Sequence, residues 1–340
     1  MKVFILSLLS LIGSALNTNK FELRNSFDNW VKTFSIDLKD TETESRFFDN
    51  WVTNDKLIRE TNEKDLSYTL AHNAFSGYSQ KEFSELMSLK NSKPFTFSSS
   101  FFEFSSPEEL PVSIDWRTKG VVNPIKDQGQ CGSCWAFSTV QAVESAVALK
   151  TGVLYNLSEQ QLVDCDDMDF GCSGGWMDNA FNWINQNNGL CSDDDYPYVS
   201  GNSGMSNKCL TTCSLKPNTK VMSHVDIPQN SDIALMQILS QQPVSVAIEA
   251  DQTGFQFYSS GVFTGACGTT LDHGVGLVGY GVNTTNNLAY YILRNSWGTS
   301  WGDNGYMYLG RGNDPSTGEP YNNGNGQCGV LSKASYPVLS

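Results

Sequence analysis

The stretch GQCGSCWAF at residues 129–137 places two cysteines, Cys131 and Cys134, three positions apart. Such a pair is typical of a redox dithiol, of half a zinc site, or of two sulfurs with unrelated functions. A zinc site needs a second close pair. The nearest one, Cys209 and Cys213, lies about 75 residues further along instead of the ~12–20 typical of ribbons and fingers. The spacing therefore disfavours zinc.

The sequence around the pair favours the third possibility, in which Cys131 and Cys134 have separate roles. A redox pair would follow a strand in a small βαβ unit, but residues 123–130 are rich in turn formers and predict a loop. From Ser133 the apolar residues have helical spacing, and Thr151-Gly152 provides a stop signal. Cys134 is therefore predicted in the first turn of a buried helix, where the unpaired N–H groups and the helix dipole favour a nucleophilic thiolate.

Composition restricts the class of protein. The chain has 340 residues, of which 39% are hydrophobic, enough for a substantial core. The net charge of -14 argues against nucleic acid or anionic lipid as a partner.

The apolar run at 3–12, followed by small residues, is too short to span a membrane and predicts a signal peptide over 1–15. In an oxidising lumen nine cysteines leave at least one unpaired.

A thiolate nucleophile needs a proton acceptor, usually a histidine, and the chain has three. His72 precedes the cysteine-bearing region, and His224 lies in an unremarkable polar stretch. His273 lies in a glycine-punctuated apolar segment, residues 272–281, which predicts a buried strand. The next predicted strand leads into Asn295, whose amide is suited to orient the imidazole.

Four motifs in chain order carry a family resemblance. They are QGQCGSCW at 128–135, CSGGW at 172–176, DHG at 272–274 and NSWG at 295–298. With Cys134, His273 and Asn295 in this order, the sequence resembles the papain-like cysteine peptidases, and the cathepsin L-like group in particular. The resemblance implies a peptidase domain at 110–340 with an α+β, two-lobe fold: a helical lobe, a β-barrel-like lobe, and the active-site cleft between them.

The resemblance also implies the roles of individual residues. Cys134 is the nucleophile and His273 its base, with Asn295 orienting the imidazole, and Gln128 stabilises the oxyanion. Trp297 is expected to cover the hydrogen bond between His273 and Asn295. The expected substrate-binding residues are Gly174 and Gly175, which leave room for a peptide strand, and Trp176, Met177, Ala247, Leu271, Asp272 and Lys333 around the pocket for the second residue before the cleaved bond. Lys333, at the pocket floor, is expected to disfavour Arg there and to tolerate Glu or Asp.

Four disulfides follow from the same resemblance and its remainder: Cys131–Cys172, Cys165–Cys209, Cys267–Cys328 and Cys191–Cys213. Asn156 and Asn283 each begin a glycosylation sequon. No metal or cofactor is expected.

The region before the enzyme, residues 16–109, resembles the family's inhibitory prosegment, a small helical domain. Trp51, Asn54, Ile58 and Asn62 recur at helical intervals, whereas the second motif, residues 71–77, lacks the usual Gly and Asp at its ends. We expect a zymogen that is latent near neutral pH and is activated by acid. The prosegment and its connector carry many carboxylates, and their protonation would weaken the docking of the prosegment on the enzyme.

The function indicated is a cysteine endopeptidase of the lysosome, the vacuole or the extracellular space. Its expected partners are protein and peptide substrates, its own prosegment and cystatin-like inhibitors, and the enzyme is expected to be monomeric. Two alternatives from other classes are a thiol-disulfide oxidoreductase that uses Cys131 and Cys134, and a catalytically silent binding protein of the same fold.

Overall fold

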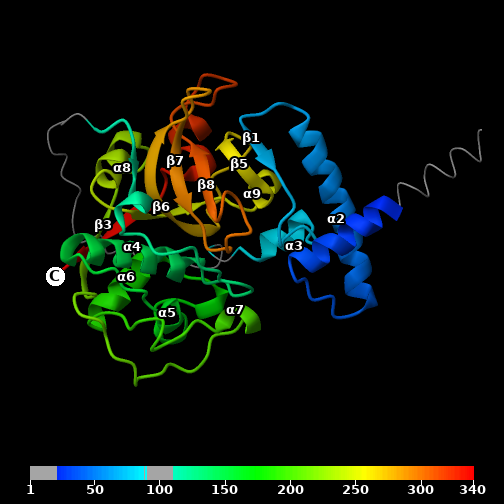
Figure 1. Cartoon of the computed structure of the whole chain (residues 1–340). Coiled ribbons are helices and arrows are strands. Elements are labelled where there is room, and N and C mark those ends of the chain that lie inside the picture. Colours follow the sequence, from blue (N-terminus) through cyan, green and yellow to red (C-terminus); the bar gives the residue numbers. More distant parts are fainter. Residues whose placement is uncertain (1–20, 88, 90–109) are drawn as a thin grey trace, which may run out of the picture.

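The computed structural model describes residues 21–87, 89 and 110–340. The predicted signal peptide, residues 1–15, lies outside the described residues, as does the predicted connector between prosegment and enzyme, residues 91–109. Three parts are evident in Figure 1: the prosegment with α2 and α3, a sheet that includes β5 to β8, and a helical lobe with α4 to α7.

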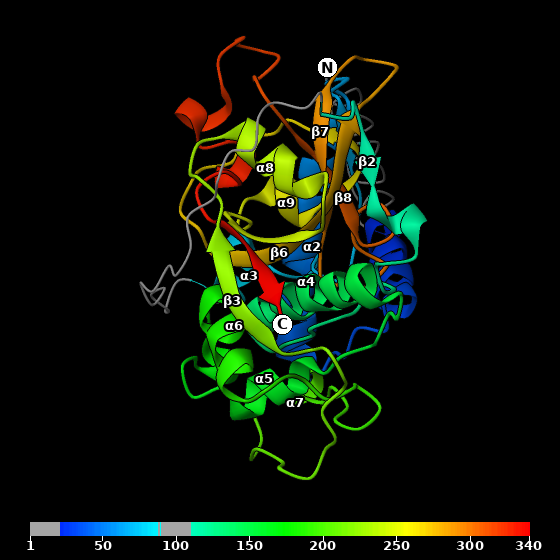
Figure 2. The same ribbon diagram turned by 90° about the vertical axis from the view of Figure 1, so that its left-hand side faces the viewer.

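The helical lobe is built around one central helix, α4, Cys134–Thr151. Every residue from 134 to 148 is buried, including polar side chains such as Gln141 and Glu144, so the helix is enclosed on all sides. The helix ends at Gly152, whose φ of 76° lies in the left-handed region that favours glycine. Figure 2 shows α4 between the sheet and the other helices of the lobe. These are α5, Glu159–Cys165; η3, Gly171–Ser173; α6, Met177–Gln186; and α7, Ser200–Ser203.

The sheet has nine strands, eight of them in the order β1-β5-β8-β7-β6-β4-β9-β3, with β2 beside β6. The strands are β1, Tyr68–Leu70; β2, Ile114–Asp115; β3, Val221–Asp226; β4, Val244–Ile248; β5, Tyr258–Phe263; β6, His273–Val282; β7, Ala289–Arg294; β8, Tyr306–Gly310; and β9, Ala334–Leu339. Short helices connect them: η2, Trp116–Lys119; α8, Asp232–Leu239; α9, Thr253–Gln256; η4, Tyr321–Gly324; and η5, Gln327–Gly329. The barrel-like lobe is therefore an open sheet among the described strands, and it is not a closed barrel.

The prosegment folds around its own aromatic core. Residues 21–33 are helical, and α2, Thr41–Asn62, follows them. These two helices bury Phe27, Trp30, Phe47 and Trp51 against one another. Strand β1 then pairs antiparallel with β5 of the enzyme, and α3, Gln80–Glu85, begins with a capping box at Ser79.

The predicted stripe on α2 anchors the loops of the prosegment. Asn54 donates from Nδ2 to the carbonyl oxygens of Ser76 and Tyr78, both at 2.9 Å. Asn62 accepts from the N–H of Leu70 and donates to its carbonyl oxygen. The stripe therefore joins the long helix to the segment that enters the sheet.

Candidate active site

Cys134 is the first residue of α4, and its sulfur faces the sheet. Of the nine cysteines it alone is in no disulfide, and it is fully buried. The backbone N–H of Gly274, next to His273 on β6, donates to its Sγ at 3.4 Å. The start of the central helix and the start of β6 therefore meet at this sulfur.

His273 and Asn295 form a hydrogen-bonded pair beside it. Nε2 of His273 lies 2.8 Å from Oδ1 of Asn295, and the Ser296 N–H donates to the same oxygen at 2.8 Å. Because a backbone N–H fixes this atom as the acceptor, the imidazole must donate from Nε2. In the neutral ring Nδ1 is then the proton-accepting nitrogen.

Trp297 covers this pair. Its indole stacks on the imidazole with ring centroids 4.7 Å apart and an interplanar angle of 24°. Burial lowers the pKa of His273 to about 4, although the hydrogen bond to Asn295 acts in the opposite direction. In the proform the imidazole is therefore neutral.

Gln128 connects the loop before α4 with the loop that carries Asn295. Its Nε2 donates to the Cys131 carbonyl oxygen at 3.1 Å, and its Oε1 accepts from Ser296 Oγ at 2.7 Å. Its backbone N–H also donates to the Ser296 carbonyl oxygen at 2.8 Å. The carboxamide is thus held within the two loops that carry Cys134 and Asn295.

A buried ion-pair group supports the same loop. Lys126 Nζ lies 2.7 Å from Glu159 Oε1 and 3.3 Å from Glu144 Oε1, and it donates to the Leu157 carbonyl oxygen at 3.0 Å. Burial acts to lower the pKa of Lys126, but the two carboxylates raise it overall. The ammonium group therefore stays charged and ties the loop to α4 and α5.

Gly174 and Gly175 form a narrow wall next to Cys134. Gly174 has a φ of 117°, which favours glycine, and a Cβ on Gly175 would lie 2.5 Å from the Trp135 ring. The Trp176 N–H is anchored by Asp169 Oδ1 at 3.0 Å. The two glycines were predicted from the sequence, whereas Asp169 was not.

The predicted pocket residues are brought together. Trp176, Met177 and Ala247 belong to one buried cluster with Cys134, and Leu271 packs against it. The Ala247 N–H donates to the Lys333 carbonyl oxygen at 2.9 Å, which places Lys333 beside this wall. The side chain of Asp272 accepts from the Ala250 N–H, and its backbone oxygen accepts from the Leu89 N–H of the prosegment.

The prosegment lies against this surface. Leu89 is 1% exposed, belongs to the cluster of Cys134, Trp176, Met177 and Ala247, and donates its N–H to the Asp272 carbonyl oxygen at 3.1 Å. Phe75 and Phe83 pack edge-on against Trp297 at 5.2 and 5.5 Å. A pocket of about 540 Å³ remains between the prosegment and the enzyme, and Arg46, Phe75, Asp127 and Trp297 are among the residues that line it.

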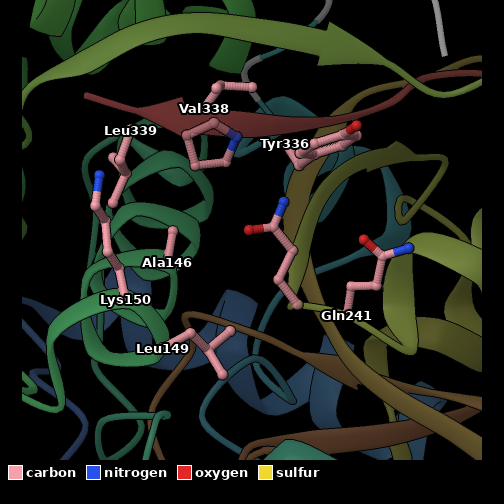
Figure 3. A pocket seen from close by; sticks show the side chains of 9 residues that line it. Ala146, Leu149, Lys150, Gln241, Tyr336, Val338 and Leu339 are labelled. Atoms are coloured by element: carbon pink, nitrogen blue, oxygen red, sulfur yellow. The ribbon is translucent and has the colours of Figure 1, made fainter. Parts of the chain in front are cut away.

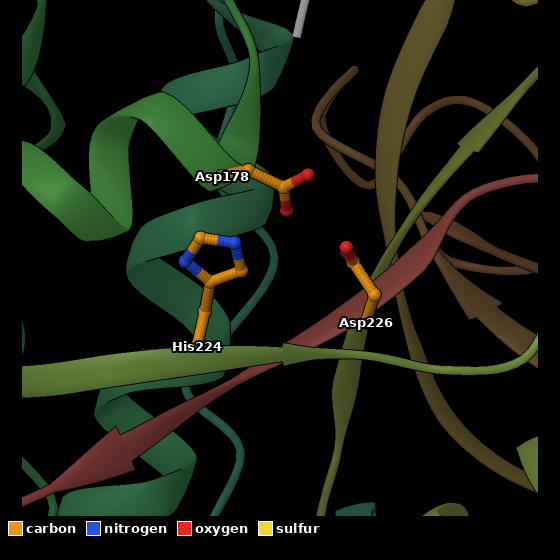
Figure 4. A group of neighbouring side chains, drawn as sticks. All are labelled: Asp178, His224 and Asp226. Carbon is orange, nitrogen blue, oxygen red and sulfur yellow. The ribbon is translucent and has the colours of Figure 1, made fainter. Parts of the chain in front are cut away.

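One group of titratable side chains was not expected. Asp178, His224 and Asp226 place one ligand-type atom each within 4.8 Å of one another (Figure 4). His224 is 2% exposed, so the expectation of an unremarkable polar stretch was wrong. Strand alternation puts His224 and Asp226 on the same face of β3, which is the sequence signal that could have found them. Burial, then repulsion by Asp178, raises the pKa of Asp226.

A further pocket, of about 390 Å³, lies at the other end of α4 from Cys134 (Figure 3). It is lined by residues near the end of α4, by Gln241 and Gln242, and by β9. None of the predicted site residues lines it.

The four disulfides of the structure are Cys131–Cys172, Cys165–Cys209, Cys191–Cys213 and Cys267–Cys328. Three are the pairings that the resemblance implied, and Cys191–Cys213 is the pairing that the remaining cysteines predicted. Asn156 is exposed, and Asn283 lies in the hairpin loop between β6 and β7. No helix in the described part of the chain is long and apolar enough to cross a membrane.

Comparison with known proteins agrees with this arrangement. Residues 110–338 match the papain family of cysteine proteases, and residues 27–83 match the cathepsin propeptide inhibitor domain. The thiol protease SEN102 of Hemerocallis and the KDEL-tailed cysteine endopeptidase CEP2 of Arabidopsis thaliana are each 42% identical over 93% of this chain and 86% of the relative.

Solved structures of proforms are also similar. The proform of the ragweed pollen allergen Amb a 11, a cysteine protease, has a TM-score of 0.79 and 33% identity, covering 94% of this chain and 95% of that chain. A recombinant stem bromelain precursor has a TM-score of 0.81 and 34% identity, covering 94% and 99%.

The fold and the site thus define a cysteine-type endopeptidase with its propeptide attached. The chain belongs to the papain family of cysteine proteases, and its N-terminal part is a cathepsin-type propeptide inhibitor domain.

Proposed function

We propose that the protein is a secreted, lysosomal or vacuolar endopeptidase that cleaves peptide bonds through Cys134, His273 and Asn295. The observation that carries the proposal is that the Cys134 thiol, which is in no disulfide, contacts the N–H of Gly274, next to His273. Since Nε2 donates to Asn295, Nδ1 is the nitrogen that accepts the thiol proton.

The reaction follows from these positions. The Cys134 thiolate attacks the peptide carbonyl carbon, the bond to the leaving nitrogen breaks, and His273 protonates the departing amine. Water then hydrolyses the acyl-enzyme with His273 as the base. The Gln128 side chain and the Cys134 backbone N–H stabilise the oxyanion, and each donor contributes on the order of 3 kcal/mol in analogous sites.

The charge state of His273 changes when the prosegment leaves. Leu89 and the phenylalanines that pack on Trp297 keep the site buried, and burial is the main cause of the low pKa of His273. Release of the prosegment admits water, so an imidazolium–thiolate pair becomes stable, each charge favouring the other.

Labelling tests this proposal. A peptidyl epoxide should modify Cys134 stoichiometrically after residues 16–109 are removed. Cys134→Ala and His273→Ala should abolish peptide hydrolysis. An oxidoreductase would instead reduce insulin and tolerate His273→Ala, and a silent binding protein would not react with the epoxide. The disulfide between Cys131 and Cys172 argues against the redox alternative because no dithiol remains.

The pocket beside Cys134 suits an apolar side chain on the second residue before the cleaved bond. Leu89 of the prosegment packs in the cluster of its walls, and Lys333 lines a small pocket of about 10 Å³ with Trp176 and Met177. An ammonium group here disfavours Arg by repulsion and desolvation, while Leu and Phe gain from the apolar walls. Asp178 and Asp226 line the same small pocket and reduce this repulsion.

Fluorogenic peptides with Leu, Arg and Glu at this place measure the effect. Lys333→Ala should raise kcat/KM for Arg relative to Leu and lower it for Glu, and Lys208→Ala, an exposed position, should change neither ratio. Equal cleavage of Arg and Leu peptides by the wild type excludes Lys333 as a specificity residue.

The prosegment acts as the inhibitor and releases the enzyme in acid. His72 stacks on Trp51 with ring centroids 4.4 Å apart and lies 3.2 Å from Asp55 Oδ1. Burial lowers the pKa of His72, although Asp55 opposes this. The folded prosegment therefore favours the neutral His72 ring. The stability that this preference contributes is complete above about pH 6.5 and is lost as the pH falls below that value.

Adding separately expressed residues 16–109 to the mature enzyme tests the inhibition. We expect inhibition at pH 7 in the micromolar range or below, and weaker inhibition at acidic pH. Absence of inhibition at pH 7 contradicts the proposal.

A further inference from the structure

We propose that Asp166 and Asp169 share one proton, that this proton holds the glycine wall beside Cys134 in place, and that its loss at alkaline pH weakens substrate binding. Asp166 follows the last residue of α5, and Asp169 lies just before η3. This inference rests on the proposed function, because it assigns substrate to the wall of Gly174 and Gly175.

Both carboxyl groups are nine-tenths buried, with exposed fractions of 6% and 8%. Asp166 Oδ1 accepts from the Met168 N–H at 2.8 Å. Asp169 Oδ1 accepts from the Trp176 N–H and from Asn179 Nδ2, both at 3.0 Å. If both groups are ionised, both Oδ2 atoms are buried acceptors without a donor, a costly arrangement. One proton between the two groups supplies the missing donor.

The surrounding charges favour this proton. The charged neighbours that act on the pair are Asp167 on the same turn and Asp178 on α6, and both are acidic. The central helix α4 presents the uncharged Trp135 ring at this place. Burial, followed by repulsion from Asp169, raises the pKa of Asp166 to about 8, and burial also raises the pKa of Asp169. The two groups titrate as a pair. We assign the shared proton to Asp166 because its Oδ1 accepts one N–H, whereas Asp169 Oδ1 accepts two donors that favour the ionised form.

The pair is mechanically connected to the wall. A Cβ on Gly175 would lie 2.8 Å from Asp169 Cγ and 2.5 Å from the Trp135 ring, so the carboxyl group and the indole together fill the space behind this glycine. Asp169 also fixes the N–H of Trp176, whose side chain belongs to the pocket wall. When Asp166 loses the proton, two buried like charges repel, and the Trp176 anchor moves away from its position. Cys134 and His273 lie on α4 and β6, outside this turn, so KM should respond more than kcat.

Two variants and one control test the pair in the activated enzyme. For the wild type we expect KM to rise about fivefold between about pH 6.5 and 8.5, the size of one lost hydrogen bond to the wall. Asp166→Asn carries a permanent donor, so its KM should stay flat over this range. Asp166→Ala lacks the donor and should have the high KM already at the lower pH. Asp194→Asn, at an exposed position that is not among the charges acting on the pair, should behave like the wild type.

A direct titration separates this inference from the proposed function. In the full-length Cys134→Ala zymogen, labelled with ¹³C at the aspartate carboxyl carbons, one signal assigned to the pair should titrate between about pH 7 and 8 and vanish in Asp166→Asn. Failure of all variants to cleave peptides contradicts the proposed function. The titration still tests the shared proton in that case, because it does not depend on peptide cleavage. Two ionised carboxyl groups at pH 6.5, the same rise of KM in Asp166→Asn, or a titration abolished by EDTA would each overturn the inference.

Discussion

Cys131 and Cys134 are near neighbours in the chain, and we expect opposite results when each is replaced. The reference protein is the full-length zymogen with Cys134→Ala, in which self-cleavage cannot complicate unfolding. The perturbation is the added pair Cys131→Ser and Cys172→Ser, which removes one disulfide without leaving a lone thiol.

The magnitude follows from the loop that the disulfide closes. Cys131 and Cys172 are 41 positions apart, for which loop-closure entropy gives about 4 kcal/mol of stability. For a domain of this size the melting temperature should fall by roughly 8–16 °C. Cys134→Ala removes one buried sulfur and its 3.4 Å contact with the Gly274 N–H, so we expect a cost of only about 1 kcal/mol.

Guanidinium unfolding without reductant measures both effects, and hydrolysis of a Leu-containing peptide measures activity. Cys134→Ala should have no activity and nearly the stability of the wild-type zymogen held at neutral pH. The enzyme that keeps Cys134 but lacks the disulfide should retain activity at temperatures where it is folded. If the disulfide variant unfolds within about 1 kcal/mol of the reference, or if Cys134→Ala itself unfolds the protein, the assigned roles are wrong.

Three further changes have defined outcomes. His72→Phe keeps a ring on Trp51 but cannot be protonated, so the midpoint of acid activation should move to lower pH, and an unchanged midpoint in an activation time course excludes His72 as the trigger. Lys126→Met leaves two buried carboxylates without a cation and should cost about 3–5 kcal/mol in chemical unfolding, whereas the exposed Lys119→Met should cost almost nothing. Gly175→Ala places a methyl group 2.5 Å from the indole behind it and should raise KM at least about tenfold; a normal KM would show that the wall yields easily.

The sequence by itself determined the helix and the strand that carry Cys134 and His273. Helical spacing after Ser133 and the stop at Gly152 predicted α4 with Cys134 at its start, and the apolar glycine-rich segment predicted the strand of His273. These predictions succeeded because apolar periodicity and residues that end a helix act over a few neighbours in the chain and need no distant contact.

Only the tertiary structure decided what depends on distant neighbours. It left the sheet open among the described strands and packed Leu89 of the prosegment among the pocket walls. It also buried His224, which the sequence presents as an ordinary polar residue, and the carboxyl group of Asp169. The protonation of such groups is set by the water they lose and by the charges that folding places beside them, and a linear sequence records neither.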